Sequence, residues 1–294
     1  MKIALAGRLL NPVNARRILR LMALLEKKGA EICCGEQLAC GLHDTCPDAV
    51  VPSVRFSDLL PPDVTMLLAI GGDGTLLATL ELLAGRDIPV AGINFGRLGF
   101  LTSAAMDSDS PAWVDDLLEG RYSIIGREML HAACSDLPCG FYPYALNEFT
   151  LRRKDGGMLS VDISVDGNPL PTYWADGVLI ATPTGSTAYS LSLGGPVVFP
   201  GSGVMLITPL APHNLNVRPL VIPPASKVEM TFPSSSENVV LSADSRMTDI
   251  PGGAHLVITR SETPLRCVSF GDNNFIKALT TKLFWGEDRR NTTI

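Results

Sequence analysis

The 294-residue chain lacks the features that mark membrane-spanning, secreted and nucleic-acid-binding proteins. No apolar run reaches the roughly 18 residues that a membrane-spanning helix needs. The formal net charge is −6, whereas general nucleic-acid binders usually carry a basic surface. Met1–Gly7 has the composition of a signal-peptide start, but Arg8 interrupts the apolar stretch too early. We therefore interpret this stretch as a first buried strand and expect a cytoplasmic protein with no membrane or nucleic-acid partner.

Paired metal-binding motifs and a dinucleotide fingerprint are also missing. The seven cysteines are odd in number and none shows C-x-x-C spacing, which favours reduced thiols over disulfides or a zinc site. The densest group has only His43 nearby and comprises Cys33, Cys34, Cys40 and Cys46. No G-x-G-x-x-G motif follows the first predicted strand, where Gly7 stands alone, so a Rossmann dehydrogenase is not favoured.

The first hundred residues have the pattern of an α/β domain. A chain of this length, 46% hydrophobic and 18% charged, can bury the cores of two domains. Short apolar runs predict strands, and apolar residues at helical spacing predict helices between them. The strands are expected at Lys2–Ala6, Val64–Ile70 and Pro89–Ile93, and the helices at Asn14–Lys28 and Thr75–Ala84. Such alternation predicts a parallel sheet, in which ligands bind at the carboxyl ends of strands.

The second half of the chain has the pattern of a β-rich domain. Apolar and polar residues alternate along Leu159–Val165 and Val228–Phe232, which is typical of half-buried strands. Helices are expected only near Ala112–Leu118, after Thr184 and at Asn274–Trp285. We therefore divide the chain into an α/β parallel-sheet domain (1–105), a C-terminal β-rich sandwich domain (106–271) and a final segment returning to the first domain (272–294).

The segment Gly71-Gly72-Asp73-Gly74-Thr75 follows the second predicted strand directly and precedes a helix. Glycines let the backbone approach a bulky anion, and the N-terminus of a helix favours phosphate. A carboxylate repels phosphate, so Asp73 suggests a role in chemistry, either holding Mg²⁺ or accepting a proton from a hydroxyl that becomes phosphorylated. The alternative is an ordinary turn, in which glycine and aspartate are common for local reasons.

A second glycine-rich segment follows the apolar run at Val178–Ala181. Hydroxyl side chains are dense there, at Thr184, Ser186, Thr187, Tyr189, Ser190 and Ser192. Hydroxyls and backbone amides suit sugar hydroxyls, an adenine edge or phosphate oxygens, and the Tyr189 ring could stack on a base. The alternative is a Ser/Thr loop that caps a helix beginning near Ser186. Asn147-Glu148, at a strand start, is by itself most typical of a solvated turn.

Taken together, these segments resemble the NAD kinase family over nearly the whole chain. Gly71–Thr75 is the less specific motif, because lipid kinases of the diacylglycerol type share it. Thr182–Pro196 is highly specific. The matching pieces are Gly71–Thr75, Asn94–Leu101, Asn147-Glu148, Asp176–Pro196 and Pro212–Leu220. The resemblance implies an N-terminal α/β domain, a C-terminal β-rich domain and an active site between the domains that often involves a neighbouring subunit.

The resemblance also implies a reaction and roles for individual residues. A phosphoryl group is transferred to the 2′-hydroxyl of the adenosine ribose of NAD to give NADP, with ATP or polyphosphate as donor, a divalent cation (Mg²⁺) and a homo-oligomeric enzyme. Asp73 matches the catalytic aspartate, with Gly72 and Gly74 beside the donor phosphates. The other matching positions, expected to contact NAD, are Asn147, Glu148, Asp176, Thr187, Ala188, Tyr189, Ser190 and Ser192.

The chain departs from the family pattern at two places near the expected pocket edge. Phe199 stands where many members have histidine, and Asp244-Ser245-Arg246 stands where many have Asp-Gly-Gln. Arg246 is therefore expected to offer a charge to a substrate phosphate. Further candidate cations for the donor are Arg8, Arg97 and Arg218, each equally interpretable as a salt-bridge residue.

Two other functions stay open on the sequence alone. A lipid kinase would use the same glycine–aspartate turn, but it should have an apolar acceptor groove, which the hydroxyl-rich Thr184–Ser192 segment does not favour. A dinucleotide-sensing module would keep that segment without needing Asp73. The sequence leaves undecided which phosphoryl donor is used and whether NADH is accepted.

Overall fold

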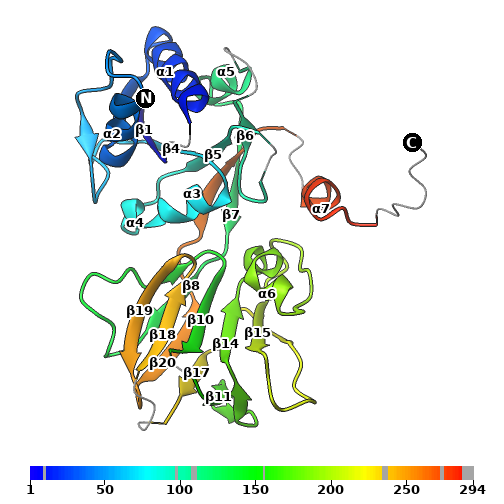
Figure 1. Cartoon of the computed structure of the whole chain (residues 1–294). Helices are drawn as coiled ribbons and strands as arrows, with labels where there is room; N and C mark the ends of the chain where they lie inside the picture. Colours follow the sequence, from blue (N-terminus) through cyan, green and yellow to red (C-terminus); the bar gives the residue numbers. More distant parts are fainter. Residues whose placement is uncertain are drawn as a thin grey trace. The chain divides into compact units, whose positions relative to one another are not determined.

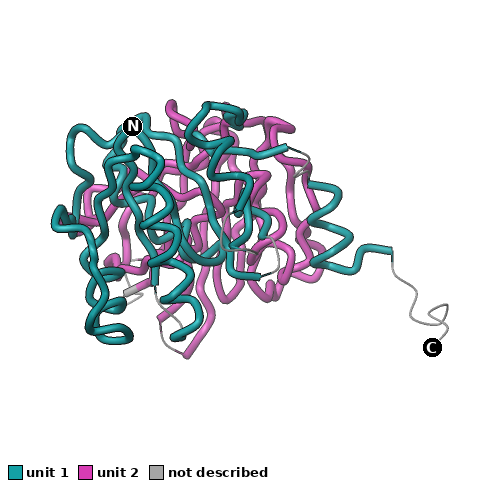
Figure 2. The backbone as a smooth tube through the Cα atoms, turned by 90° about the horizontal axis from the view of Figure 1, so that it is seen from above, with its two compact units in different colours: residues 1–125, 266–294 teal, residues 126–265 magenta. Residues whose placement is uncertain are grey.

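The computed structural model describes residues 1–8, 11–96, 99–106, 111–154, 156–233, 238–271 and 275–286. The chain forms two compact units, Met1–Ile125 with Arg266–Ile294 and Gly126–Leu265 (Figure 2). The structure divides the chain after residues 125 and 265, whereas the sequence pattern places the divisions after residues 105 and 271. The division falls there because β7 (Ser123–Arg127) and β21 (Leu265–Ser269) are neighbouring strands in the sheet of the first unit.

The first unit is built on a mainly parallel sheet with helices around it (Figure 1). Besides β7 and β21, its strands are β1 (Lys2–Gly7), β2 (Glu31–Gly35), β3 (Arg55–Phe56), β4 (Met66–Ile70), β5 (Val90–Asn94) and β6 (Ala104–Ala105). Its helices are α1 (Pro12–Lys27), α2 (Glu36–Thr45), α3 (Asp73–Ala78), α4 (Leu80–Leu83), α5 (Trp113–Leu118) and α7 (Phe275–Leu283). The strand order is β3-β2-β1-β4-β5-β21-β7, with β6 paired to β5.

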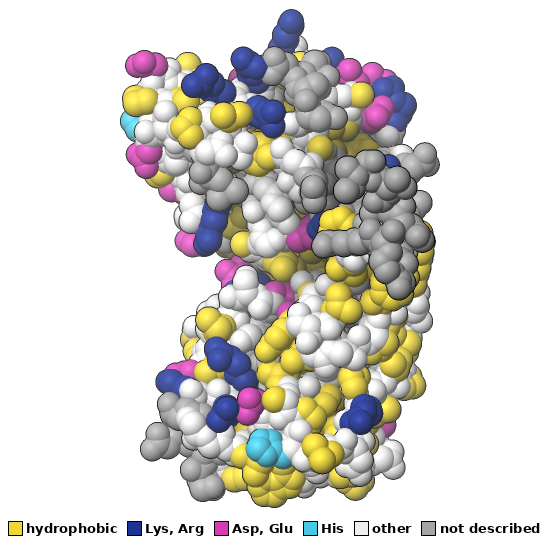
Figure 3. Space-filling model, turned by 45° about the vertical axis from the view of Figure 1, so that its right-hand side comes forward, with side chains coloured by type: hydrophobic (Ala, Val, Ile, Leu, Met, Phe, Trp, Pro, Cys, Tyr) yellow, Lys and Arg dark blue, Asp and Glu magenta, His cyan; other side chains and the backbone are white. Residues whose placement is uncertain are grey.

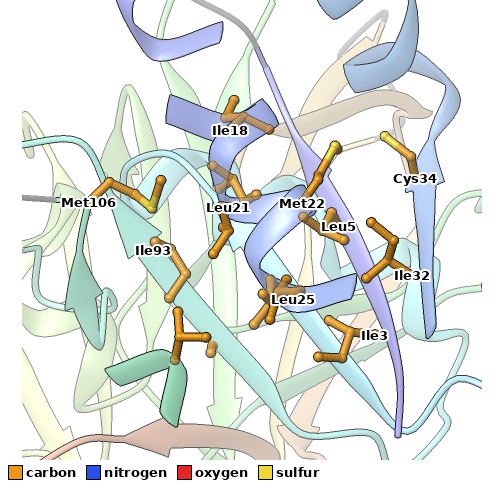
Figure 4. Packing of buried hydrophobic residues seen from close by; sticks show 14 of the residues in the cluster. Ile3, Leu5, Ile18, Leu21, Met22, Leu25, Ile32, Cys34, Ile93 and Met106 are labelled. Carbon is orange, nitrogen blue, oxygen red and sulfur yellow. The ribbon is translucent and has the colours of Figure 1, made fainter. Parts of the chain in front are cut away.

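Alternate side chains of the central strands face two different layers. Ile3 and Leu5 of β1 pack with Ile18, Leu21 and Leu25 of α1 in one fully buried cluster (Figure 4). The intervening residues of β4, such as Leu67, are buried outside this cluster. Because successive side chains of a strand point to opposite faces, both faces of the sheet are covered, as expected for a parallel sheet.

The predicted helix at Thr75–Ala84 is present as two short helices. α3 and α4 are separated at Thr79, whose hydroxyl donates to the Leu76 carbonyl at 2.7 Å. α4 ends at Leu83 and is capped by Ala84, which has a left-handed backbone conformation with φ of 47°. This local hydrogen bonding competes with a continuous helix, which the apolar spacing alone does not reveal.

The second unit is a sandwich of two antiparallel sheets. Its strands are β8 (Leu130–Ala133), β9 (Tyr144–Ala145), β10 (Glu148–Arg153), β11 (Leu159–Val165), β12 (Asn168–Pro169), β13 (Tyr173–Ala175), β14 (Gly177–Ala181), β15 (Met205–Leu210), β16 (Leu220–Ile222), β17 (Val228–Thr231), β18 (Asn238–Ala243), β19 (Arg246–Pro251) and β20 (His255–Arg260). Its helices are the 3₁₀ helix η1 (Thr184–Thr187) and α6 (Tyr189–Ser192).

The core of the second unit lies between its two sheets. One sheet has the order β16-β15-β14-β10-β18-β19 and the other β12-β11-β17-β20-β8-β9, with β13 paired to β11. Phe149 and Ile180 of the first sheet belong to the same buried cluster as Val161, Met230 and Ile258 of the second. The prediction of an α/β parallel-sheet domain followed by a β-rich sandwich is confirmed. In the described part of the chain, no helix combines the length and hydrophobicity needed to cross a membrane.

Candidate active site

The glycine turn of the first unit carries Asp73 from the end of β4 into α3. Gly71 has φ of +151°, a backbone conformation that residues with side chains rarely adopt, and an added Cβ would lie 2.2 Å from Oγ1 of Thr75. Gly71 therefore serves the turn itself. Asp73 is the first residue of α3, so its side chain is presented at the carboxyl end of a central strand.

Three N–H donors hold the Asp73 carboxylate. The backbone N–H of Phe100 donates to Oδ2 at 2.9 Å and that of Leu101 to Oδ1 at 3.1 Å. Nζ of Lys282, from α7, lies 3.1 Å from Oδ2. A carboxylate offers about four acceptor positions, so room remains for one more donor such as a substrate hydroxyl. The Asp73 side chain is 28% exposed and thus accessible to a ligand.

Gly99 permits this arrangement. A Cβ at this position would lie 1.8 Å from Oδ1 of Asp73 and 2.8 Å from Oγ1 of Thr102. The Gly99 N–H donates to the same Thr102 hydroxyl, which fixes the loop that presents the N–H groups of Phe100 and Leu101. Any larger residue at position 99 would therefore displace the carboxylate.

Gly72 and Gly74 differ from Gly71 and Gly99. Within the described residues, a Cβ at either position would meet nothing within 4 Å. Gly72 has ordinary extended angles, φ −80° and ψ −173°, and Gly74 lies in α3, where glycine costs up to about 1 kcal/mol relative to alanine. No packing or backbone requirement within the described chain explains these glycines, whereas close approach of a ligand to the backbone would.

In the second unit, Asp244 fixes the backbone of Asn147-Glu148. Its carboxylate accepts backbone N–H groups from Leu146 at 3.0 Å, Asn147 at 2.7 Å and Glu148 at 3.3 Å. The Asp244 side chain is fully buried, and its guanidinium neighbour Arg246 lies 3.7 Å away. Asn147-Glu148 is thus a rigid, buried feature and not the solvated turn that the sequence pattern alone favours.

Glu148 is a buried carboxyl group whose Oε2 has no hydrogen-bond partner among the described residues. Burial, and secondarily the charge of Asp244, raise the pKa of Glu148 to about 8, against a lowering by the backbone N–H of Tyr189. Burial also raises the pKa of Asp244, but three backbone N–H groups and Arg246 oppose that rise. Since Asp244 has the donors that stabilise a charge, we assign the protonated state to Glu148.

The hydroxyl-rich segment packs directly against Asn147. A Cβ on Gly185 would lie 2.1 Å from the Asn147 carbonyl oxygen, and the Thr182 hydroxyl, which accepts from the Gly185 N–H, donates to the carbonyl of Leu146 at 2.6 Å. Ser186 is fully buried and bonded to the backbone of Pro183 and Val198. Some of the hydroxyls therefore hold the segment in place.

The predicted ligand contacts in this segment are not equivalent. The Ser190 hydroxyl is buried and lies 3.2 Å from the Thr208 hydroxyl, and the Thr187 hydroxyl donates to the Thr184 carbonyl at 3.3 Å. Ala188 is half-buried. Ser192 and Tyr189 are exposed, with 44% of Tyr189 accessible. Tyr189 and Ser192 are therefore the side chains of this group that can meet a ligand most readily.

Asp176 and Tyr189 line one pocket of about 370 Å³ within the second unit. The same pocket is lined by Arg152, Arg153 and Lys154, and Arg153 pairs with Asp176 at 3.0 Å. A basic rim of this kind is complementary to the phosphates of a nucleotide. On the face drawn in Figure 3, cationic side chains lie in small groups, several with acidic side chains nearby.

The remaining candidate cations have structural contacts or lie outside the described part. Arg246 donates to the Tyr144 carbonyl and lies over the Tyr142 ring at 5.2 Å. Arg218 donates to the carbonyls of Leu215 and Val217 in its own loop. Arg8 is exposed next to β1, and Arg97 is outside the described residues. Phe199 is 54% exposed.

The two units thus carry different groups of predicted residues. The first carries Asp73 with Gly72 and Gly74, and the second carries the candidates for NAD contacts. Sequence reasoning missed the contact of Lys282 with Asp73, because the two residues are 209 positions apart. It also missed the buried anchor Asp244, which it treated only as part of a departure from the family pattern.

Comparisons with known proteins show the family to which this chain is similar. The chain matches the family model of the ATP-NAD kinase N-terminal domain over residues 3–122 and that of the ATP-NAD kinase C-terminal domain over residues 146–270. It is 36% identical to an NAD kinase of Flavobacterium psychrophilum over 99% of this chain and 100% of that protein. It is 37% identical to an NAD kinase of Bacteroides fragilis over the same shares.

Solved structures show the same two-domain fold. Yeast NADH kinase complexed with NADH superimposes with a TM-score of 0.85 and 25% identity, covering 100% of this chain and 90% of that one. An NAD kinase from Archaeoglobus fulgidus in complex with ATP gives a TM-score of 0.71 at 24% identity, covering 97% and 98%. The second likeness bears on the fold alone.

Proposed function

The chain belongs to the ATP-NAD kinase family and phosphorylates NAD, and from this premise we propose how its residues carry out the reaction. The 2′-hydroxyl of the adenosine ribose attacks the terminal phosphorus of ATP. A new O–P bond forms, the bond to the bridging oxygen breaks with its electron pair leaving on ADP, and the hydroxyl proton passes to Asp73. The product is NADP.

The contacts of the Asp73 carboxylate are the main support for its role as general base. Two backbone N–H groups, from Phe100 and Leu101, fix its orientation, and it is accessible to a hydroxyl. A fixed carboxylate loses no orientation freedom when the hydroxyl arrives, which is how positioned groups accelerate phosphoryl transfer. General-base catalysis of this kind contributes about 10²–10⁴-fold.

The donor phosphates are proposed to lie against the backbone of Gly72 and Gly74. Both positions have open space around the missing side chains, so phosphate oxygens can approach the chain closely. Mg²⁺ commonly binds through one or two carboxylates plus substrate phosphates. Asp73 already accepts three N–H donors, and its remaining acceptor position is assigned to the hydroxyl, so the cation is proposed to arrive with the triphosphate and to be held mainly by phosphate oxygens. When bound, the cation would neutralise charge on the phosphates.

The second unit is proposed to bind NAD. The relative complexed with NADH supports a nicotinamide dinucleotide as the ligand. Tyr189, exposed at the rim of the pocket, is proposed to stack on the adenine, and Asp176 to face the nicotinamide end. Asn147 and Glu148, fixed by Asp244, are proposed to hold the ribose hydroxyls, with the protonated Glu148 able to donate as well as accept. Thr187, Ala188, Ser190, Ser192 and Arg246 stay candidates for the surrounding contacts.

The test is NADP formation from NAD, ATP and Mg²⁺, read with an NADP-specific dehydrogenase. Asp73→Asn should keep NAD binding by calorimetry and lose activity by about 10²–10⁴-fold. Asp63→Asn is a matched control, since Asp63 is an exposed carboxylate of the same unit that also pairs with a lysine, Lys2, at 2.7 Å. Asp73→Asn with normal turnover would contradict the assigned role.

The same assay separates the alternatives. Replacing ATP by other nucleoside triphosphates or polyphosphate identifies the donor, and replacing NAD by NADH tests the second acceptor. Phosphorylation of diacylglycerol in place of NAD would instead favour a lipid kinase, and NAD binding without turnover a sensing module. From the family resemblance we also propose a cytoplasmic homo-oligomer, to be tested by light scattering and by imaging the tagged protein in cells.

A further inference from the structure

We propose that Lys282 of the C-terminal helix is a positioning residue for Asp73, which compensates the charge of the carboxylate and thereby allows a polyanionic donor to lie beside it. This inference rests on the proposed role of Asp73 as the general base. The starting observation is that Nζ of Lys282 lies 3.1 Å from Oδ2 of Asp73 within the first unit.

The helix α7 is anchored at the loop that holds Asp73. Phe275, the first residue of α7, packs its ring against that of Phe100 with a centroid distance of 5.9 Å. Leu279, one turn further along, is buried with 7% exposed. The same Phe100 donates its backbone N–H to Asp73. α7, which follows β21 in the chain (Figure 1), is therefore attached to the residue that orients the carboxylate.

Lys282 is itself held in place by this loop. Its ammonium lies 4.9 Å from the centroid of the Phe100 ring, a cation–π contact, and makes the ion pair with Asp73. The Lys282 side chain is 26% exposed, so the pair is partly shielded from solvent. A flexible lysine held at two points loses little further freedom when a ligand arrives, which is the condition for preorganised electrostatics.

The charge balance explains why a cation is needed at this position. The proposed reaction brings the highly negative triphosphate next to an aspartate, and like charges oppose each other. Of the candidate cations considered from the sequence, Arg218 is engaged with carbonyls of its own loop in the second unit. Among the described contacts of Asp73, the cationic one comes from Lys282. Two N–H groups and one ammonium then orient the carboxylate while its remaining acceptor capacity meets the hydroxyl.

The experiment compares three variants in the full-length protein: Lys282→Met, Lys282→Arg and the control Lys277→Met. Lys277 is an exposed lysine of the same helix, so its substitution removes the same charge from α7. For Lys282→Met we expect kcat to fall by about ten- to hundredfold, less than the 10²–10³ typical of a fully buried preorganised donor, because the pair is partly exposed. Lys282→Arg should recover kcat to within about threefold, and Lys277→Met should change it less than about twofold.

A merely structural role of Lys282 would give a different pattern. In that case Lys282→Met would lower the melting temperature while the folded enzyme kept its kcat. The kcat values of Lys282→Arg and Lys282→Met would then be the same. The proposed role requires a loss of kcat in protein whose circular dichroism and calorimetric NAD affinity match the wild type. A Lys282→Met kcat within about twofold of wild type, or no rescue by arginine, would overturn the inference.

The double variant Asp73→Asn/Lys282→Met separates this inference from the proposed function. If Lys282 acts through Asp73, the double variant should be no slower than Asp73→Asn alone, because residues that work as a unit are not additive. A further fall of about tenfold would mean that Lys282 acts on the substrate independently, against the inference. Normal turnover by Asp73→Asn would instead remove the proposed function, whatever Lys282 does.

Discussion

Glu148→Gln should stabilise the protein at alkaline pH relative to the wild type. Glu148 is 8% exposed, and burial raises the pKa of its carboxyl group to about 8 from the ordinary value of 4.5. A carboxyl whose folded pKa is raised binds more protons in the folded state than in the unfolded state. Its contribution therefore destabilises the fold progressively as pH rises from the unfolded pKa to the folded one, and is constant outside that window.

The magnitude follows from the difference between the two pKa values. One pKa unit corresponds to about 1.4 kcal/mol, so the complete effect above pH 8 is at most about 5 kcal/mol. Between pH 6 and pH 9 this single group should lower the free energy of unfolding by about 2 to 3 kcal/mol. Glutamine has no proton to lose, so the variant should lack this component. Its Nε2 can also occupy the position of the protonated oxygen.

The assay is urea unfolding followed by circular dichroism at pH 6, 7, 8 and 9. The quantity of interest is the difference in unfolding free energy between Glu148→Gln and wild type, because titrating groups that do not interact with Glu148 cancel in that difference. It should grow with pH in favour of the variant. Glu26→Gln, which removes an exposed carboxylate of α1, serves as the control. A difference that is flat between pH 6 and 9, or that grows in favour of the wild type, would refute the assignment of a buried, protonated Glu148.

Two further predictions concern glycines near Asp73. Gly99→Ala should lower kcat at least about a hundredfold, because its Cβ would lie 1.8 Å from Oδ1 of Asp73. Gly126→Ala is the control, since its Cβ would meet Pro264 at an ordinary 3.7 Å, and equal kcat in both variants would contradict the geometry. Gly74→Ala should leave the fold as stable or up to about 1 kcal/mol more stable, yet raise KM for ATP about tenfold. Thermal melts and initial rates measure both, and an unchanged KM would mean that no ligand approaches Gly74.

Much of the fold could be predicted from the sequence because its core strands are short and strongly patterned. Met66–Ile70 is a buried apolar run, as parallel strands require, and Leu159–Val165 alternates, as half-buried antiparallel strands do. β2 and α2 were not predicted. Cys33 and Cys34 fill β2 as small buried residues, and burial raises the pKa of their thiols to about 11 and about 12. Both cysteines therefore act as small hydrophobic side chains of the core.

The candidate site was predictable only where its residues are close in sequence. Gly71–Thr75 and the hydroxyl-rich segment are local motifs, and each lies where the strand pattern predicts. Asp244 anchors a segment almost a hundred residues earlier, and Lys282 reaches Asp73 from the other end of the chain. Such contacts depend on which strands and helices become neighbours, and a single sequence carries no local signal for them. The hydroxyl-rich segment shows a second limit of sequence reasoning. Its pattern is typical of ligand binding, but the hydroxyls of Ser186 and Ser190 make hydrogen bonds within the protein that hold the segment in place.

The glycines near Asp73 are present for different physical reasons. Gly71 is required by its φ and by Thr75, and Gly99 by the carboxylate that lies against it. Neither backbone angles nor close contacts with the described residues require glycine at positions 72 and 74. Gly74 lies in α3, where glycine lowers the stability of the helix relative to alanine. Open space around a glycine that weakens its own helix is consistent with close approach of a ligand to the backbone. The explanation consistent with the family is a donor phosphate at the backbone, and it implies that the two halves of the motif should separate experimentally: substitution of Gly71 should damage the fold, and substitution of Gly74 the binding of ATP.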